Sequence, residues 1–366
     1  MKSFMTCILF FAAIQEISNQ GTPTKQSTTA ITPTGNLFII TIDGFRWQEI
    51  FNGADSSIIN DARYCPDSET MKMMYWSSDV EGRRKKLLPF FWNVIGERGQ
   101  LYGNRRLNNK MNTANGFSIS YPGYNEIFSG ATDLSIATNS RYTNSHINVL
   151  EYLANRDGFQ GKVAAFTSWD VFPYILNKSK SHIVINSGYE KMESCSSTQE
   201  LISEVQEKHM LNKTETRHDE LTFLTAIEYL RSSAPKVLYL ALGETDEAAH
   251  DGRYDTYLEK ASEADRMLAR LWHFVQTTKG YKDNTTFVIT TDHGRGNRRG
   301  NWMQHGTFIT GSSQTWMGVI GPNIEPLGEV KDEQQIYQKQ LAQTIAALVG
   351  ETFISDRKIA PAIALQ

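Results

Sequence analysis

The sequence predicts an α/β fold with a mostly parallel central sheet, helices on both faces and cap insertions. Three apolar, β-branched runs each lead into acidic residues or histidine, at residues 37–42, 237–242 and 287–291. Runs of this kind are typical of parallel strands that are buried on both faces. Strand candidates also alternate with amphipathic helical segments, as in a doubly wound sheet. Because ligands in such sheets gather beyond the carboxyl ends of the strands, we expect the polar residues after these runs to meet there.

The other elements continue this alternation. Further strands are expected at residues 163–166, 182–185 and 315–320. Residues 257–275 place apolar side chains three or four positions apart, which predicts an amphipathic helix. A second helix is expected at residues 340–349, ended by Gly350. Residues 52–110 and 190–235 are polar and poorly periodic, and we interpret them as insertions that cap the site.

Length and composition indicate one large domain over residues 36–366. The chain of 366 residues is 40% hydrophobic and 11% aromatic, which is enough for a large core. Its 37 basic and 40 acidic side chains give a formal charge of −3. This balance argues against a general electrostatic affinity for nucleic acid or for an anionic membrane. We therefore expect a small-molecule partner, and the oligomeric state stays open.

The first residues predict export to the periplasm or out of the cell. Residues 1–20 combine a short basic start with an apolar stretch too short to span a bilayer, so we interpret them as a secretory signal rather than a buried helix. Residues 21–35 are rich in Thr, Pro and Gly and are interpreted as a linker. No later stretch is apolar enough to predict a membrane span. Export would allow Cys65 and Cys195 to pair, although two separate buried thiols fit the sequence equally well.

Seven residues have the ligand chemistry of a two-metal site. They are Asp43, Ser120, Asp246, His250, Asp292, His293 and His305. Asp246 and His250 stand four positions apart, which places them on one face of a helix. Asp292 and His293 are followed by Gly294, which predicts a turn where both side chains can reach one ion. Each residue alone has an ordinary explanation as a cap, a turn former or a hydrogen-bonded histidine, but the whole set favours a metal site.

Ser120 lies just ahead of a helix that Pro122 is expected to start. The free N–H groups and the positive dipole end of such a helix favour an alkoxide and an incoming anion. Ser120 is therefore a candidate nucleophile, although a simple helix cap is the commoner role of an isolated Ser-x-Pro. Ser118 is the competing candidate.

The order of these motifs resembles the alkaline phosphatase superfamily, in its nucleotide pyrophosphatase/phosphodiesterase branch. The resemblance covers residues 37 to about 350 and depends on Asp43-Gly44, Ser120-Tyr121-Pro122, Asp246-x-x-x-His250, Thr291-Asp292-His293-Gly294 and His305-Gly306. It implies two ion sites with Ser120 between them. One site would comprise Asp246, His250 and His305, and the other Asp43, Asp292 and His293. Zn²⁺ is the ion that the resemblance implies, and the mixed carboxylate and imidazole ligands agree with it, with Mn²⁺ as the alternative.

The resemblance implies a metal-dependent hydrolase of phosphoric esters that acts through a phospho-serine intermediate. Two divalent ions can hold the attacking and leaving oxygens of an in-line displacement at phosphorus. Ser120 would be the nucleophile. The leading expectation is a phosphodiesterase or nucleotide pyrophosphatase acting on a small phosphorylated substrate, and a phosphomonoesterase is the alternative.

One departure from the branch concerns the contact to the phosphoryl oxygen. We expect an Asn three residues after the nucleophile, and Gly123 stands there instead. Either Asn125 or backbone N–H groups that Gly123 exposes to the substrate would then make this contact.

A second departure concerns charge. Related monoesterases carry a Lys-x-Arg clamp, whereas the comparable stretch here is residues 168–171, Ser-Trp-Asp-Val. Its absence favours diesters, and Trp169 would offer an aromatic surface to the leaving group, although such a ring is more often part of a core. Arg46, Lys110 or Arg141 could still bring a cation to the site from elsewhere.

Other functions of related proteins fit less well. Sulfatases of the superfamily need an Arg two residues after the motif proline, and Tyr124 stands there. Phosphosugar mutases share the metal ligands but work inside cells, which the predicted signal contradicts. A non-catalytic binding protein would be expected to have lost a ligand, and none is missing from the set.

Overall fold

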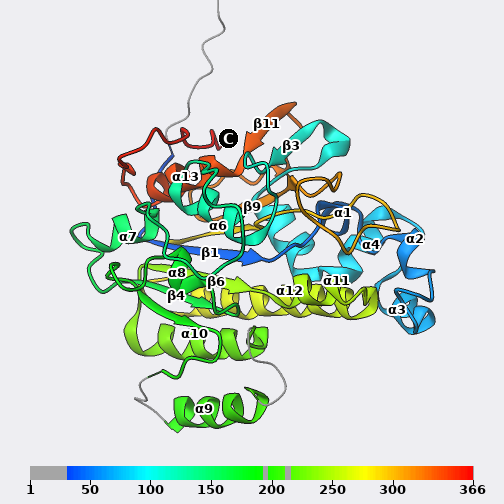
Figure 1. The fold of residues 1–366 in the computed structure, drawn as a ribbon, viewed down its shortest axis with the longest axis horizontal. Helices are drawn as coiled ribbons and strands as arrows, with labels where there is room; N and C mark the ends of the chain where they lie inside the picture. The colour runs from blue at the N-terminus through cyan, green and yellow to red at the C-terminus, as the bar shows by residue number, and fades with distance from the viewer. Residues whose placement is uncertain (1–30, 193–196, 211–215, 366) are drawn as a thin grey trace, which may run out of the picture.

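The central sheet has the predicted α/β architecture. The computed structural model describes residues 31–192, 197–210 and 216–365, so the predicted signal and most of the predicted linker lie outside it. Within these ranges the strands follow the order β10-β2-β9-β7-β1-β6-β4-β5 (Figure 1). Five neighbouring strands are parallel, namely β7 (Thr285–Thr290), β1 (Asn36–Ile42), β6 (Val237–Leu242), β4 (Val163–Thr167) and β5 (Val184–Ser187). The prediction of a mostly parallel sheet is confirmed.

The edge beyond β7 differs from the sequence prediction. The predicted strand 315–320 is divided at Trp316 into β8 (Gln314–Thr315) and β9 (Met317–Ile320). β9 runs antiparallel to β7 and to β2 (Gln100–Tyr102), which continues to β10 (Gly328–Glu329). β8 joins a small sheet with β3 (Asn109–Asn112) and β11 (Gln334–Tyr337). The segment 52–110 is therefore more than an insertion, because its β2 belongs to the central sheet.

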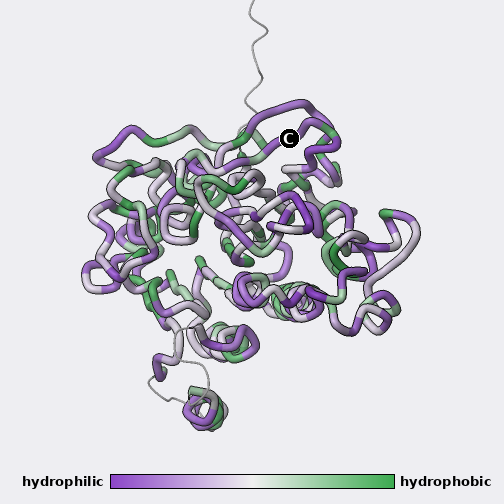
Figure 2. Tube along the Cα trace, turned by 45° about the vertical axis from the view of Figure 1, so that its right-hand side comes forward, coloured by the Kyte–Doolittle hydropathy of each residue, from purple (hydrophilic) through white to green (hydrophobic). Residues whose placement is uncertain are grey.

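Helices cover both faces of the sheet, because alternate residues of its strands point to opposite sides. In β1, Phe38 and Ile40 enter one core, while Leu37 and Ile39 enter the other. The first face carries α10 (Asp219–Ser233), α11 (Glu244–His250) and α12 (Tyr254–Thr277), and the second carries α6 (Ser120–Ser129), α7 (Val149–Ala154), α8 (Phe172–Ile175) and α13 (Leu341–Leu348) (Figure 1). The loops at the periphery are mostly hydrophilic (Figure 2).

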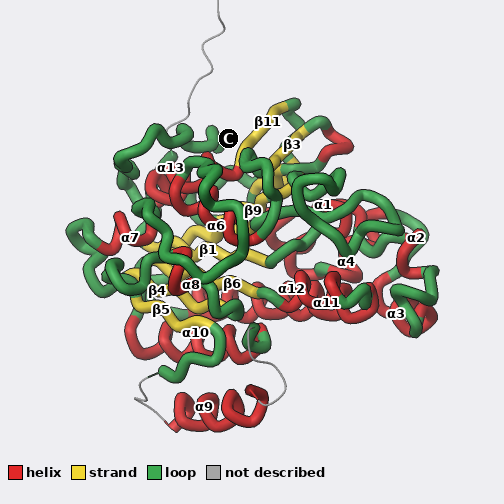
Figure 3. The backbone as a smooth tube through the Cα atoms, in the orientation of Figure 1, coloured by secondary structure: helices red, strands yellow, loops and turns green. Residues whose placement is uncertain are grey.

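Short helices connect β1 to β2 and fill the right-hand end in Figure 3. They are α1 (Trp47–Asn52), α2 (Ser56–Ile59), α3 (Ser68–Tyr75), α4 (Val80–Leu87), the π-helix η1 (Phe91–Ile95) and α5 (Gly96–Arg98). The remaining helices are η2 (Arg105–Leu107), α9 (Ser197–Met210) and η3 (Gln338–Gln340). Cys65 is buried among these short helices, while Cys195 lies outside the described residues, so the pairing of the two stays a prediction.

The topology brings the predicted ligands to one edge of the sheet. β1 lies between β6 and β7, with Ile42 level with Leu242 and Thr41 level with Thr290. The three strands therefore end together, and the residues that follow them meet at their carboxyl ends. Among the described residues, no helix is long and apolar enough to cross a membrane.

Candidate metal centre

The structure brings six of the predicted ligands into two groups. Asp246, His250 and His305 form one group, and Asp43, Asp292 and His293 form the other. In each group the ligand atoms lie within 4.8 Å of one another. The second group is fully buried, whereas His250 keeps the first group open to solvent. The two groups match the two sets that the resemblance implied.

In the buried group, each of the two carboxylates accepts a hydrogen bond through one oxygen, and its other oxygen has no hydrogen-bond partner in the described part of the chain. Tyr124 donates its hydroxyl to Asp43 Oδ2 at 2.9 Å, and the Gly44 N–H donates to Asp292 Oδ1 at 3.0 Å. Asp43 Oδ1 and Asp292 Oδ2 are buried and have no hydrogen-bond partner among the described residues. An unpaired buried carboxylate oxygen is costly. A cation would satisfy both, so these residues fit a metal ion.

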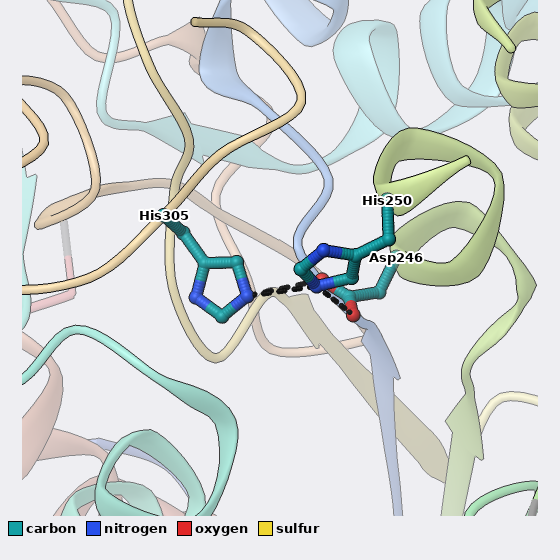
Figure 4. A group of neighbouring side chains, drawn as sticks. All are labelled: Asp246, His250 and His305. Carbon is teal, nitrogen blue, oxygen red and sulfur yellow. Dashed lines mark hydrogen bonds and ion pairs between the residues drawn. The ribbon is translucent and has the colours of Figure 1, made fainter. Parts of the chain in front are cut away.

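In the open group, the imidazoles face each other through their Nε2 atoms. These atoms of His250 and His305 lie 3.0 Å apart, and His250 Nε2 lies 3.1 Å from Asp246 Oδ2 (Figure 4). His305 Nδ1 lies 3.2 Å from the Ser118 carbonyl, to which it donates its proton. The Nε2 lone pair of His305 is then directed at His250. This convergence of lone pairs fits a metal ion. The hydrogen bond from His305 Nδ1 to the Ser118 carbonyl is of the kind that orients imidazole ligands.

Burial and repulsion shift the pKa values of the buried group. Burial, together with the charges of Asp292 and Asp246, raises the pKa of Asp43 well above its usual value. Burial also raises the pKa of Asp292 to about 6 and lowers that of His293 to about 4. His293 is therefore neutral at pH 7, as a ligand must be. A divalent cation would offset the repulsion between the carboxylates.

Arg295 is a residue of the centre that the sequence reasoning missed. It is completely buried, and its Nη2 contacts Asp246 Oδ1 and also donates to the Asp246 carbonyl at 3.1 Å. Although burial alone would raise the pKa of Asp246, Arg295 and His250 outweigh it and hold that pKa well below the usual value. Its position directly after the Asp-His-Gly motif was the available signal.

Reciprocal caps fix the helix that carries Asp246 and His250. At the start of α11, the N–H groups of Gly243 and Glu244 donate to the Asp219 carboxylate at 2.8 and 3.0 Å. In return, the Asp219 N–H donates to Glu244 Oε2 at 3.0 Å, at the start of α10. Carboxylates stabilise helix N-termini, where N–H groups lack partners. This exchange fixes α11 against α10 and so positions two of the ligands.

Ser120 lies beside the buried group, whereas Ser118 does not face it. Ser120 Oγ is 3.4 Å from His293 Nε2, at the first residue of α6. The Ser118 hydroxyl instead lies 3.3 Å from Thr113 Oγ1. Ser118 has a left-handed φ of 48° and contributes its carbonyl to His305. The geometry therefore favours Ser120 as the nucleophile of the two.

A cavity of about 530 Å³ opens over the centre. Its walls include Asp43, Ser120, Asn139, Arg141, Trp169 and Asp246. Of the three cations considered from the sequence, only Arg141 belongs to this wall. Arg46 is buried in an ion pair with Glu49, and Lys110 lies in the small sheet.

Asn125 and Gly123 are the two positions predicted to provide the contact to the phosphoryl oxygen. Neither is part of this cavity wall. Asn125 is buried away from the cavity, where its Nδ2 donates to the Ala131 carbonyl at 3.3 Å and its Oδ1 accepts from Asn144 at 2.9 Å. A Cβ at Gly123 would lie 2.5 Å from the Asp292 carbonyl oxygen, so glycine lets α6 pack against the metal centre. The cavity-wall amide is that of Asn139, which the sequence reasoning missed because no motif marks it.

The comparisons with known proteins agree with this architecture. Residues 179–305 match the family model described as the Metalloenzyme superfamily. No curated protein sequence matches the chain. Wild-type alkaline phosphatase PafA shares the fold with a TM-score of 0.59 at 11% identity, covering 91% of this chain and 99% of its own.

Two further solved structures show the same fold. The phosphonate monoester hydrolase of Agrobacterium radiobacter has a TM-score of 0.54 at 12% identity, with coverage of 90% of this chain and 76% of its own. An alkaline phosphatase superfamily protein from Vibrio parahaemolyticus has a TM-score of 0.52 at 12% identity, with coverage of 88% and 67%. Residues 179–305 thus match the Metalloenzyme superfamily model, and the described chain has the fold of these alkaline phosphatase superfamily structures.

Proposed function

We propose that the protein is an exported two-metal phosphoric ester hydrolase of the phosphodiesterase or nucleotide pyrophosphatase type. The observation that carries the proposal is the convergence of two Asp/His groups on one cavity, with the Ser120 hydroxyl beside His293. Zn²⁺ is the proposed ion, because carboxylate and imidazole ligands suit it. When bound, two such ions would stabilise charge on the attacking and leaving oxygens.

Ser120 is the proposed nucleophile of a two-step displacement. Its Oγ forms a bond to phosphorus while the bond from phosphorus to the leaving oxygen breaks, and the leaving group departs as an alcohol or a phosphate. Water then cleaves the phospho-serine and restores the hydroxyl. Because α6 begins at Ser120, the positive end of its dipole lies at this position and favours the developing negative charge.

Asn139 is the proposed amide contact to a phosphoryl oxygen. Its Oδ1 accepts from the Tyr121 N–H at 2.9 Å, which fixes the amide beside the nucleophile. The side chain is on the cavity wall, and its Nδ2 can donate to an anionic oxygen. This replaces the role that the sequence reasoning gave to Asn125.

Trp169 supports the choice of a diester. The ring packs edge-on against Phe172, 6.2 Å between centroids, and also forms part of the cavity wall. A second organic group on the phosphate can pack against such a surface. A phosphomonoesterase remains the alternative, and the observation in its favour is the cation Arg141 on the same wall.

The position and contacts of Tyr124 argue against sulfatase activity. It occupies the position where that motif needs an Arg, and it is completely buried, with its hydroxyl given to Asp43. This side chain supports a candidate ligand instead of reaching into the cavity.

The test compares three substrates with one purified enzyme in the presence of Zn²⁺. We expect kcat/KM for bis-p-nitrophenyl phosphate to exceed that for p-nitrophenyl phosphate, with little hydrolysis of p-nitrophenyl sulfate. The physical reason is that the diester carries one negative charge less and offers a second apolar group. A tenfold or greater preference for the monoester would favour the phosphatase instead.

A further inference from the structure

The cavity cation is held in an ion pair. Arg141 Nη2 lies 2.9 Å from Asp170 Oδ1 and 2.7 Å from Asp170 Oδ2. The two side chains are 48% and 30% exposed, so solvent and a substrate can reach them. Asp170 stands between Trp169 and Val171, which are both part of the cavity wall. The pair therefore joins the loop after α6 to the turn after β4 at the edge of the cavity.

The loop that carries Arg141 is anchored to the residue after the nucleophile. The Tyr121 N–H donates to Asn139, and the Tyr121 hydroxyl donates to the Tyr142 carbonyl at 2.7 Å. The rings of Tyr121 and Tyr142 also stack, with centroids 4.9 Å apart. Anchors on both sides of Arg141 hold its backbone in a fixed relation to Ser120. Asp170 is a partner of the guanidinium at the edge of the cavity.

The charges on the cavity wall make the Arg141–Asp170 pair important for the choice between phosphate monoesters and diesters. Asp43, Asp246 and Glu247 are acidic, and Arg141 is the one Arg or Lys of the wall within the described ranges. A carboxylate that accepts from a guanidinium offsets part of its charge, and here it occupies the donors of Nη2. A dianionic monoester must therefore compete with Asp170 for the cation, whereas a monoanionic diester has less need of it.

We propose that the Arg141–Asp170 ion pair sets the preference for phosphodiesters over phosphomonoesters, with Asp170 as the specificity-determining residue. The inference rests on the proposed function. Asp170 competes with the second charge of a monoester for the guanidinium, so an uncharged side chain at this position would weaken that competition.

The experiment is a double-mutant cycle with both p-nitrophenyl esters. Asp170→Asn is expected to raise the ratio of kcat/KM for monoester over diester by about tenfold, the effect of one gained charge-assisted hydrogen bond. In an Arg141→Met background the same substitution should leave the ratio within about twofold, because the released cation is missing. An equal rise in both backgrounds, or no rise in either, would overturn the inference.

A matched pair elsewhere provides the control. Arg156 Nε lies 3.0 Å from Glu351 Oε2, with side chains 49% and 21% exposed, and neither residue belongs to the cavity wall. Glu351→Gln should leave the ratio unchanged. Thermal unfolding of each variant shows whether it is folded, and exposed pairs of this kind contribute little to stability. A wild type without diesterase activity would refute the proposed function itself, whereas a diesterase with an unchanged Asp170→Asn ratio would refute only this inference.

Discussion

Two carboxylate oxygens of the buried ligand group are left open for a cation. Tyr124 and the Gly44 N–H each hold one carboxylate oxygen, while Asp43 Oδ1 and Asp292 Oδ2 have no hydrogen-bond partner among the described residues. The Ser120 hydroxyl lies beside this group, 3.4 Å from His293 Nε2. The selective lack of partners distinguishes a prepared ligand set from an ordinary polar cluster.

At the residue scale, we predict that Ser120→Ala lowers kcat for a diester by on the order of 10³-fold or more. The substitution removes the attacking oxygen but none of the six carboxylate and imidazole ligands, so bound metal and thermal stability should stay close to wild type. Steady-state kinetics and elemental analysis of the same sample measure this. Ser118→Ala is the matched control, since that hydroxyl faces Thr113, and it should retain most of the activity. The reverse pattern would show that the nucleophile is misassigned.

Among the elements, carboxylates that accept hydrogen bonds at helix N-termini hold neighbouring helices together, both beside the metal centre and in the segment 52–110. Asp219 and Glu244 cap each other's helices beside the centre. Farther away, Asp265 of α12 accepts from the N–H groups of Phe90 and Phe91, both at 2.8 Å, at the start of η1. Such contacts dock the short helices of the segment 52–110 onto the long helix.

Burial gives Asp265 a predictable effect on stability against pH. Burial raises its pKa to about 7 despite the two N–H donors, whereas an unfolded Asp titrates near about 4. Between these values the folded protein binds more protons at this carboxyl than the unfolded chain does. The stabilising contribution of the protonated carboxyl is therefore fully present below pH about 4 and is lost as the pH rises toward 7. The free energy of unfolding changes by about 1.4 kcal/mol for each unit of pKa difference between the folded and unfolded states.

We therefore predict that Asp265→Asn reduces the loss of unfolding free energy between pH 5 and pH 8. Urea unfolding of wild type and variant at both pH values measures this. Glu69→Gln is the control, since that side chain is 88% exposed, and it should keep the wild-type difference. An unchanged pH dependence in Asp265→Asn would mean that the folded carboxyl titrates near its unfolded value.

Across the whole molecule, the centre ties together segments that are far apart in the sequence. The candidate ligands follow β1, β6 and β7, and His305 comes from the loop before β8. A bound ion would therefore cross-link several elements, and binding to the folded state alone raises stability by mass action.

We predict that elemental analysis finds about two divalent ions per chain, and that EDTA abolishes activity and lowers Tm by on the order of 5 °C. Adding Zn²⁺ back should restore both. His250→Ala, which removes the exposed ligand of one group, should reduce the stoichiometry toward one. A folded, active sample that contains almost no metal would contradict the two-metal proposal.

The sequence by itself determined the five parallel strands of the sheet and the candidate ligands, but not the antiparallel edge beyond β7. Buried strands need apolar, β-branched runs, and metal ligands need carboxylate and imidazole groups, so both leave local signals. The contacts around them were decided only by the tertiary structure. Asn139 and Asp170 carry no local signal, and Arg295 is marked only by its place after the Asp-His-Gly motif, because their roles depend on neighbours brought close by folding. For the same reason Asn125, which looked suitable from its position, is buried against Asn144, and Gly123 serves the packing of a helix.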